Sequence, residues 1–210
     1  METLTIVLFT SVALALGAMS PGPSFIVVAR MALAQWRTNG LAAAVGMGVG
    51  GFLFSIAALL GLTALLIAVP MLYPALKVVG GVYLIFLGFR LWRGARQPLE
   101  FSRSDAPEHS SILRSFVIGL ATQLSNPKTA LVYAGVFTAF LPSEPSYSLL
   151  FVLPASVLMI ETGWYSLVAI ALSAPVPRAR YLKLKAWIDR AAGVAMAALG
   201  TKLISEITST

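Results

Sequence analysis

The sequence contains no cysteine, one histidine and few charged residues, which make up 11% of the chain. Without cysteine, neither a disulfide scaffold nor a thiol redox relay is available. The single histidine, His109, lies in a polar segment, and neither H-E-x-x-H nor G-x-S-x-G occurs. Only one carboxylate, Glu161, lies in the core of an apolar segment, whereas metal sites need several Asp, Glu, Cys or His side chains. The sequence therefore indicates no enzyme, no catalytic residue, no bound metal and no cofactor.

Long apolar runs are abundant instead. Apolar residues make up 58% of the chain, the mean hydropathy is +0.86, and residues 4–29 and 38–76 carry no charge. About 20 apolar residues cross a lipid bilayer, so the sequence predicts an all-α membrane protein with six transmembrane helices. We expect them near residues 4–35, 40–67, 72–92, 112–141, 147–173 and 186–206.

The net charge of +7 is distributed unevenly along the chain. Twelve of the 15 basic residues fall on one side of the expected membrane: Arg30, Arg37, Arg90, Arg93, Arg96, Arg103, Arg114, Arg178, Arg180, Lys183, Lys185 and Arg190. Basic residues concentrate in cytoplasmic connections. The charge therefore predicts a multi-pass topology with both termini outside the cytoplasm, and not a nucleic-acid partner.

An internal repeat joins the third and sixth expected spans. At an offset of 112 residues, the pattern G-V-x4-L-G-x-[RK]-L occurs from Gly81 and again from Gly193. Since three spans is an odd number, the second copy enters the membrane from the opposite side, which predicts two inverted three-helix repeats. We expect the repeats at residues 1–96 and 112–210, with a cytoplasmic linker at 97–111. Chance recurrence of Gly and Leu in apolar helices is the alternative.

Proline motifs interrupt the first span of each half, at Ser20-Pro21-Gly22-Pro23 and Ser125-Asn126-Pro127-Lys128. Proline removes a backbone donor and clashes with the preceding turn, so helices one and four are expected to be broken. Freed backbone groups are tolerated at membrane depth only inside protein or beside a water-filled cavity. Paired breaks in two halves therefore predict the binding site of a secondary transporter.

The first break is suited to the carboxylate of an amino acid. A half-helix that begins near Ser24 exposes backbone N–H groups and carries partial positive charge. The substrate-binding candidates here are Ser20, Pro21, Gly22, Pro23 and Ser24. The alternative is a structural kink that only bends the helix around its neighbours.

The second break brings polar groups and one charge to membrane depth. Its substrate-binding candidates are Gln123, Ser125, Asn126, Pro127 and Lys128. An ionisable group at that depth is costly and is a functional candidate by default. The alternative is that Lys128 snorkels to the interface or pairs with Glu161 only for stability.

Glu161 is the proton-coupling candidate, because it is the one acidic residue inside a span core. A carboxylate there suits a proton carrier or a ligand for the substrate ammonium group. Tyr165 and Trp164 follow at four and three residues, which places them on neighbouring positions of the same helix. A buried ion pair that specifies helix register is the alternative.

The second span contains glycines 46, 48, 50 and 51. Small residues allow a neighbouring backbone to approach closely. We expect these glycines to form one smooth packing face, and contact of the exposed backbone with substrate is the alternative.

In their order and spacing these motifs resemble the LysE/RhtB amino-acid exporters. The motifs are Pro21-Gly22-Pro23, the glycine-rich second span, K-x-x-G-x-x-Y-L-x-x-L-G-x-[RK] from Lys77, Asn126-Pro127-Lys128, and Arg190-x-x-Gly193 through Gly200. The resemblance implies a bacterial inner-membrane exporter of amino acids or related metabolites that is driven by the proton gradient, and it raises the expectation of a homodimer. Members often carry a polar residue where this chain has Gly51, so the resemblance does not identify the substrate.

Three other classes are the alternatives. A small-solute channel would show flux without coupling, and a metal-ion transporter of the same superfamily would need more carboxylate, Cys or His ligands than Glu161 provides. A purely structural membrane subunit would tolerate alanine at both Lys128 and Glu161.

Overall fold

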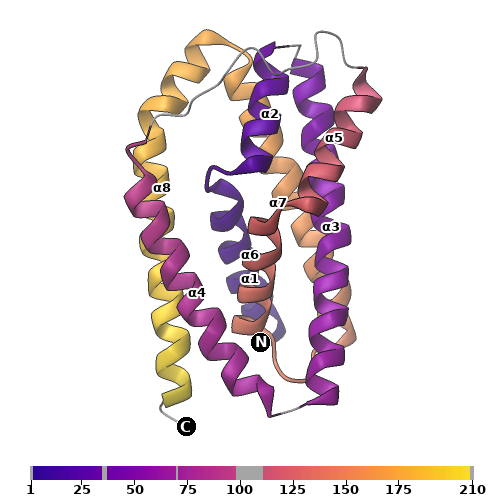
Figure 1. The fold of residues 1–210 in the computed structure, drawn as a ribbon, viewed down its shortest axis with the longest axis vertical. Helices are drawn as coiled ribbons and strands as arrows, with labels where there is room; N and C mark the ends of the chain where they lie inside the picture. Colours follow the sequence, from indigo (N-terminus) through magenta and orange to yellow (C-terminus); the bar gives the residue numbers. More distant parts are fainter. Residues whose placement is uncertain (1, 35–36, 70, 98–110, 209–210) are drawn as a thin grey trace.

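The protein is built from α-helices (Figure 1). The computed structural model describes residues 2–34, 37–69, 71–97 and 111–208, and no strand occurs within those ranges. Helices are the expected solution for an apolar chain, because they satisfy backbone hydrogen bonds without water. The helices are α1 Glu2–Met19, α2 Pro23–Ala34, α3 Arg37–Ala68, α4 Leu72–Gly94, α5 Ile112–Ser125, α6 Pro127–Phe140, α7 Tyr147–Leu172 and α8 Pro175–Thr208.

Membrane-length helices are present in both halves of the chain. By length and composition α3, α4 and α7 can each cross a bilayer. The pair α1 and α2 passes the same test as one span that is bent by 57°. The 14-residue α5 is apolar but shorter than a span. The protein is therefore a multi-pass membrane protein with three or four helical span candidates in the described residues.

Both proline motifs break their helices, as the sequence predicts. The first break separates Met19 from Pro23, and the second separates Ser125 from Pro127. Pro127 is the first residue of α6, a position whose N–H has no intrahelical partner in any helix. Asn126 caps that helix, because its side-chain oxygen accepts a hydrogen bond from the Lys128 N–H at 3.0 Å.

The last helix starts earlier than the sequence indicates. α8 begins at Pro175, whereas the apolar run predicts a span from residue 186. Its first turns are rich in Arg and Lys, so a hydropathy pattern does not detect them.

Of the expected linker at 97–111, residues 98–110 lie outside the described ranges, and the repeat boundaries stay predictions.

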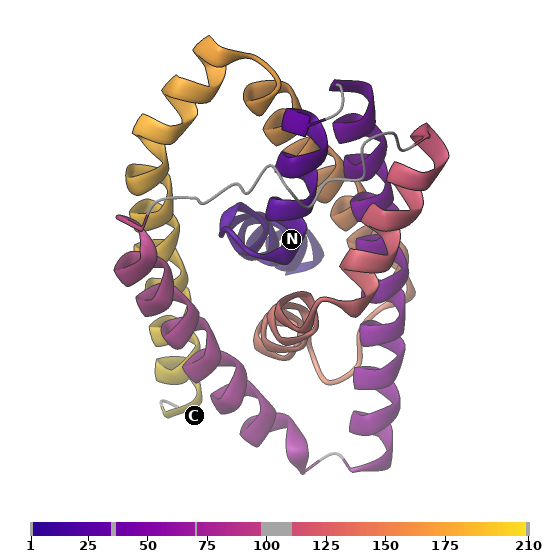
Figure 2. The same cartoon turned by 45° about the horizontal axis from the view of Figure 1, so that its top comes forward.

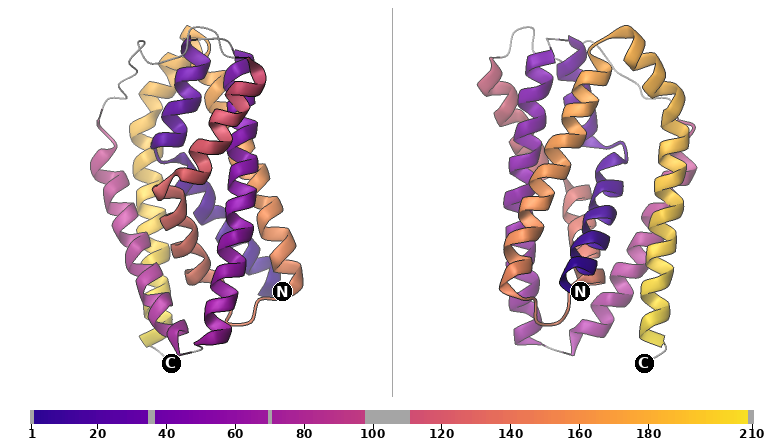
Figure 3. Two further views of the ribbon diagram at one scale, coloured as in Figure 1. Left: turned by 45° about the vertical axis from the view of Figure 1, so that its right-hand side comes forward. Right: turned by 180° about the vertical axis from the view of Figure 1, so that it is seen from behind.

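The helices form two packed groups with α1 and α6 between them (Figure 2). One group is the pair α4 and α8, which pack along each other, and the other is α3 with α5 and α7 on either side. The start of α1 and the end of α8 lie at one end of the molecule (Figure 3). The end of α4 and the start of α5 lie toward the opposite end (Figure 1).

The glycines of α3 form two packing faces and not the single face that we expected. An added Cβ at Gly46 or Gly50 would collide with α5, and one at Gly48 would collide with α7. A Cβ at Gly51 would lie 2.9 Å from Tyr133 OH on α6 and 3.2 Å from Glu161 Cγ on α7. A helix turns by about 100° per residue, so residues 46 and 50 point one way and 48 and 51 another. Two neighbours thus approach the α3 backbone closely.

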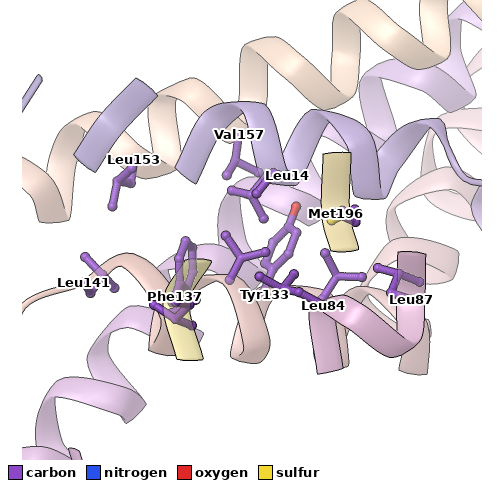
Figure 4. Packing of buried hydrophobic residues seen from close by; sticks show 14 of the residues in the cluster. Leu14, Leu84, Leu87, Tyr133, Phe137, Leu141, Leu153, Val157 and Met196 are labelled. Atoms are coloured by element: carbon purple, nitrogen blue, oxygen red, sulfur yellow. The ribbon is translucent and has the colours of Figure 1, made fainter. Parts of the chain in front are cut away.

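The largest buried cluster joins α1, α3, α4, α6, α7 and α8. Figure 4 shows Leu14, Leu84, Tyr133, Phe137 and Met196 packed against one another. Large apolar side chains also cover the outside of the helices, where lipid is their expected solvent, and polar side chains such as Gln123 and Glu161 are buried. Gln123 and Glu161 therefore find their hydrogen-bond partners inside the bundle.

Candidate functional site

Lys128 connects the two helix breaks directly. Its Nζ donates a hydrogen bond to the carbonyl of Gly17 at 3.0 Å and another to the carbonyl of Ser20. Gly17 lies in the last turn of α1, and its carbonyl also accepts from the Ser20 N–H at 3.3 Å, while Ser20 directly follows the helix. At this end of a helix the carbonyls lack the usual i+4 donors and the dipole is negative. The ammonium group of one half therefore caps the broken helix of the other half.

A chain of five buried side chains runs from the second break to Glu161. Asn126 Nδ2 donates to Ser24 Oγ at 2.8 Å, and Ser24 Oγ donates to Gln123 Oε1 at 2.6 Å. Gln123 Nε2 then donates to Glu161 Oε2 at 2.9 Å. Tyr133 OH donates to the other carboxylate oxygen at 2.9 Å. The chain links α2, α5, α6 and α7.

Glu161 is buried, with 5% of its surface exposed, and each of its oxygens accepts a hydrogen bond from a neutral donor. Lys128 lines the same cavity, yet the two side chains form no ion pair within the described part of the chain. A buried carboxylate without a countercharge in contact is costly to keep ionised. This arrangement suits a group that binds and releases a proton.

The cavity between the breaks, here called the inner cavity, has a volume of about 20 Å³. That volume holds a water molecule and no amino acid. It is lined by Leu14, Gly17, Ala18, Ser20, Gly22, Ser24, Asn126, Lys128, Thr129, Val132, Tyr133, Glu161 and Tyr165.

Most of the candidates from the sequence gather at this cavity. Five substrate-binding candidates line it directly: Ser20, Gly22, Ser24, Asn126 and Lys128. Gln123 belongs to the hydrogen-bonded chain behind it. Glu161 and Tyr165 line it from α7, whereas Trp164 packs with the separate apolar cluster around Phe25.

Other candidates lie elsewhere. Ser125 is exposed, and its Oγ donates to the Ala121 carbonyl of its own helix at 2.7 Å. Pro23 and Pro127 are exposed and begin α2 and α6. Pro21 is half-buried and lines a neighbouring cavity. These prolines shape the backbone of the site.

Sequence reasoning missed Tyr133, whose hydroxyl completes the hydrogen bonding of Glu161. A buried tyrosine hydroxyl usually has a hydrogen-bond partner. A tyrosine within an apolar span was therefore the signal in the sequence that could have identified it as a site residue. Gly51 leaves space for this pair, because an added Cβ would lie 2.9 Å from Tyr133 OH and 3.2 Å from Glu161 Cγ. The glycine that departs from the family pattern thus accommodates the carboxylate.

The chain is similar to known membrane proteins. A family model described as LysE type translocator matches residues 15–207. The chain is 32% identical to a threonine efflux protein of Escherichia coli strain K12 over 203 residues, which cover 95% of this chain and 98% of the relative. It is also 32% identical to a threonine efflux protein of Salmonella typhi over 187 residues, covering 89% and 91%. An uncharacterized membrane protein of Haemophilus influenzae is 28% identical over 191 residues, covering 90% of each chain. No solved structure is significantly similar to the chain.

Proposed function

The chain belongs to the LysE type translocator family, and we propose that it exports amino acids or related small metabolites from the cytoplasm by proton antiport. It is a transmembrane transporter and not an enzyme. The relatives named for threonine efflux support an amino-acid substrate.

One observation carries the proposal. The hydrogen-bonded chain from Asn126 to Glu161 joins both helix breaks to the one carboxylate of the inner cavity. Broken helices supply unpaired backbone groups for substrate, and a carboxylate at membrane depth supplies a proton site. Both requirements of a proton-coupled carrier meet in one place.

Each end of a zwitterionic substrate has a partner at the breaks. The carbonyls of Gly17 and Ser20 hold the ammonium of Lys128 in this structure, and they can hold a substrate ammonium in the same way. Lys128 is then free to meet the substrate carboxylate, together with the first N–H groups of α2. In this mechanism Lys128 occupies the site until substrate replaces it.

Glu161 carries the proton in the proposed cycle. The groups around it are Gln123 on α5, Tyr133 and Lys128 on α6, and Tyr165 on its own helix. Arrival of a substrate ammonium favours the ionised carboxylate, which releases its proton, and departure of the substrate favours protonation. Proton and substrate therefore exclude each other at the site, which is the condition for antiport.

A carrier fits this site better than a channel. The inner cavity of about 20 Å³ is too small for an amino acid. Substrate entry therefore requires rearrangement of the helices, as alternating access does.

We further infer six spans arranged as two inverted repeats, in the inner membrane, with both termini outside the cytoplasm. Equivalent glycines of the repeated motif support this arrangement. Gly81 packs on Gly200, and Gly193 packs on Gly88, so an exchange of the two motifs reproduces both contacts. A homodimer stays a prediction.

The proposal is tested in cells fed dipeptides, whose hydrolysis fills the amino-acid pools. Overproduction of the protein should lower the intracellular pool of its substrate and raise the amount in the medium. A membrane-inserted Ser24→Ala variant, which cuts the hydrogen-bonded chain, is the control. Identical pools with and without the protein, for every amino acid measured, would contradict the proposal.

A further inference from the structure

A second and larger cavity opens beside the first break. This outer cavity has a volume of about 560 Å³ and lies between the α1–α2 break, α4 and α8. Sites for small molecules usually measure about 300–1,000 Å³. Ser20 lines both the inner and the outer cavity, so the two spaces meet at this residue.

The outer cavity is lined by more positive than negative charge. Arg90 and Arg93 line it from α4, and Lys185 and Asp189 line it from α8. Lys185 Nζ contacts Asp189 Oδ2 at 2.8 Å, and both residues are buried. Because that pair neutralises itself, the two arginines give the lining its excess charge.

The Lys185–Asp189 pair and the two arginines have different roles in the cavity. Lys185 Nζ also donates to the carbonyl of Ala95, just after the end of α4, at 3.4 Å. This contact ties α8 to α4 and fixes the wall of the cavity. Arg90 and Arg93 are exposed, so their guanidinium groups are available to a carboxylate, which they can bind through two parallel hydrogen bonds.

We propose that the outer cavity is a second substrate site, a vestibule that binds the carboxylate of neutral and anionic amino acids and disfavours cationic ones. The inference rests on the proposed function, which makes the arginine-rich end of the bundle the cytoplasmic side. A cationic side chain raises the energy of a solute in a positive cavity, whereas an additional carboxylate lowers it. Substrate then passes Ser20 to the inner cavity when the helices rearrange.

A binding measurement separates this inference from export itself. The protein in lipid nanodiscs is titrated with radiolabelled threonine, aspartate and lysine, as neutral, anionic and cationic probes. We expect aspartate and threonine to bind at least tenfold more tightly than lysine. In an Arg90→Gln and Arg93→Gln double variant, aspartate and threonine should each bind about tenfold more weakly, the loss typical of one charge-assisted hydrogen bond.

Arg96→Gln is the matched control. Arg96 lies at the same end of α4, is exposed, and does not line the cavity. Its substitution should leave all three affinities within twofold of the wild type. Equal affinity for the three probes, binding of none, or equal effects of the double variant and Arg96→Gln would each overturn the vestibule. Transport is measured separately in everted membrane vesicles, where export from the cytoplasm is seen as uptake into the vesicle. Absence of uptake would contradict the transport proposal without changing the result of the titration.

Discussion

Gly88 and Gly193 face each other where α4 crosses α8. A Cβ on Gly193 would lie 2.6 Å from the Gly88 carbonyl oxygen, and a Cβ on Gly88 would collide with the Gly193 carbonyl. Neither contact can be relieved by a side-chain rotation, since the obstacle is backbone. The two helices therefore approach as closely as two glycines allow, as in other membrane helix pairs with small residues at the crossing.

Gly88→Ala should destabilise the protein, because the crossing must separate. We expect a loss of about 1–3 kcal/mol, the usual cost of overpacking, measured as a lower thermal transition in detergent. Gly163→Ala is the control, because an added Cβ at Gly163 meets nothing within 4 Å. That control should keep or slightly raise stability, since alanine favours helix. An unchanged transition for Gly88→Ala would show that α4 and α8 are not packed this closely.

Ser24→Ala should reduce transport at least tenfold while the protein still inserts in the membrane. The change leaves Asn126 Nδ2 and Gln123 Oε1 without the Ser24 hydroxyl between them, and buried polar groups without partners disturb a network strongly. Ser156→Ala is the comparison, because the Ser156 hydroxyl bonds only to the Val152 carbonyl in its own helix. Similar initial export rates for the two variants would argue against a functional role for the chain.

Lys128→Met should abolish export, because it removes the cation at the carbonyl end of α1. It should also lower the thermal transition, since a charge at a helix end contributes about 0.3–1 kcal/mol and charged hydrogen bonds add to it. Lys77→Met removes an equivalent charge from the start of α4, where Lys77 lies over the Tyr73 ring. If Lys128→Met exports substrate at the rate of Lys77→Met, Lys128 has no role in transport.

Glu161→Gln should retain substrate exchange but lose proton-coupled uphill transport. Glutamine keeps the shape of the side chain and one acceptor oxygen, replaces the other oxygen with an NH2 donor, and does not titrate. In proteoliposomes the variant should exchange internal for external substrate and fail to concentrate it when a pH gradient is imposed. Glu144→Gln, which changes an exposed carboxylate between α6 and α7, should behave as wild type. Uphill transport by Glu161→Gln at wild-type rates would place proton coupling on another group.

Single cysteines should report the topology without background, because the chain has none of its own. Thr38 lies in the first turn of α3, and Glu144 lies in the connection between α6 and α7. The start of α3 and that connection lie at opposite ends of the bundle (Figure 3). A membrane-impermeant thiol reagent should label Glu144→Cys in intact cells and Thr38→Cys only in everted vesicles. The reverse pattern would mean that the basic connections are not cytoplasmic.

The apolar composition and the two proline motifs determined much of the molecule without tertiary information. Stretches without charge leave helices as the available membrane structure, and Pro21 and Pro127 break their helices because proline cannot donate a backbone hydrogen bond. These effects are local, so the order of residues is enough to predict them. The presence of polar candidates at both breaks followed from the same reasoning.

Only the tertiary structure decided which of those candidates meet. Lys128 lies beside the carbonyls of Gly17 and Ser20, more than 100 residues away in the chain, and Ser125 turns back to its own helix. Which side of a helix a residue occupies follows from the 3.6-residue period, but which neighbour lies there depends on how all the helices pack. The charged outer cavity is a product of the same packing, because its arginines come from α4, near the middle of the sequence, and its buried Lys185–Asp189 pair comes from α8, at the end.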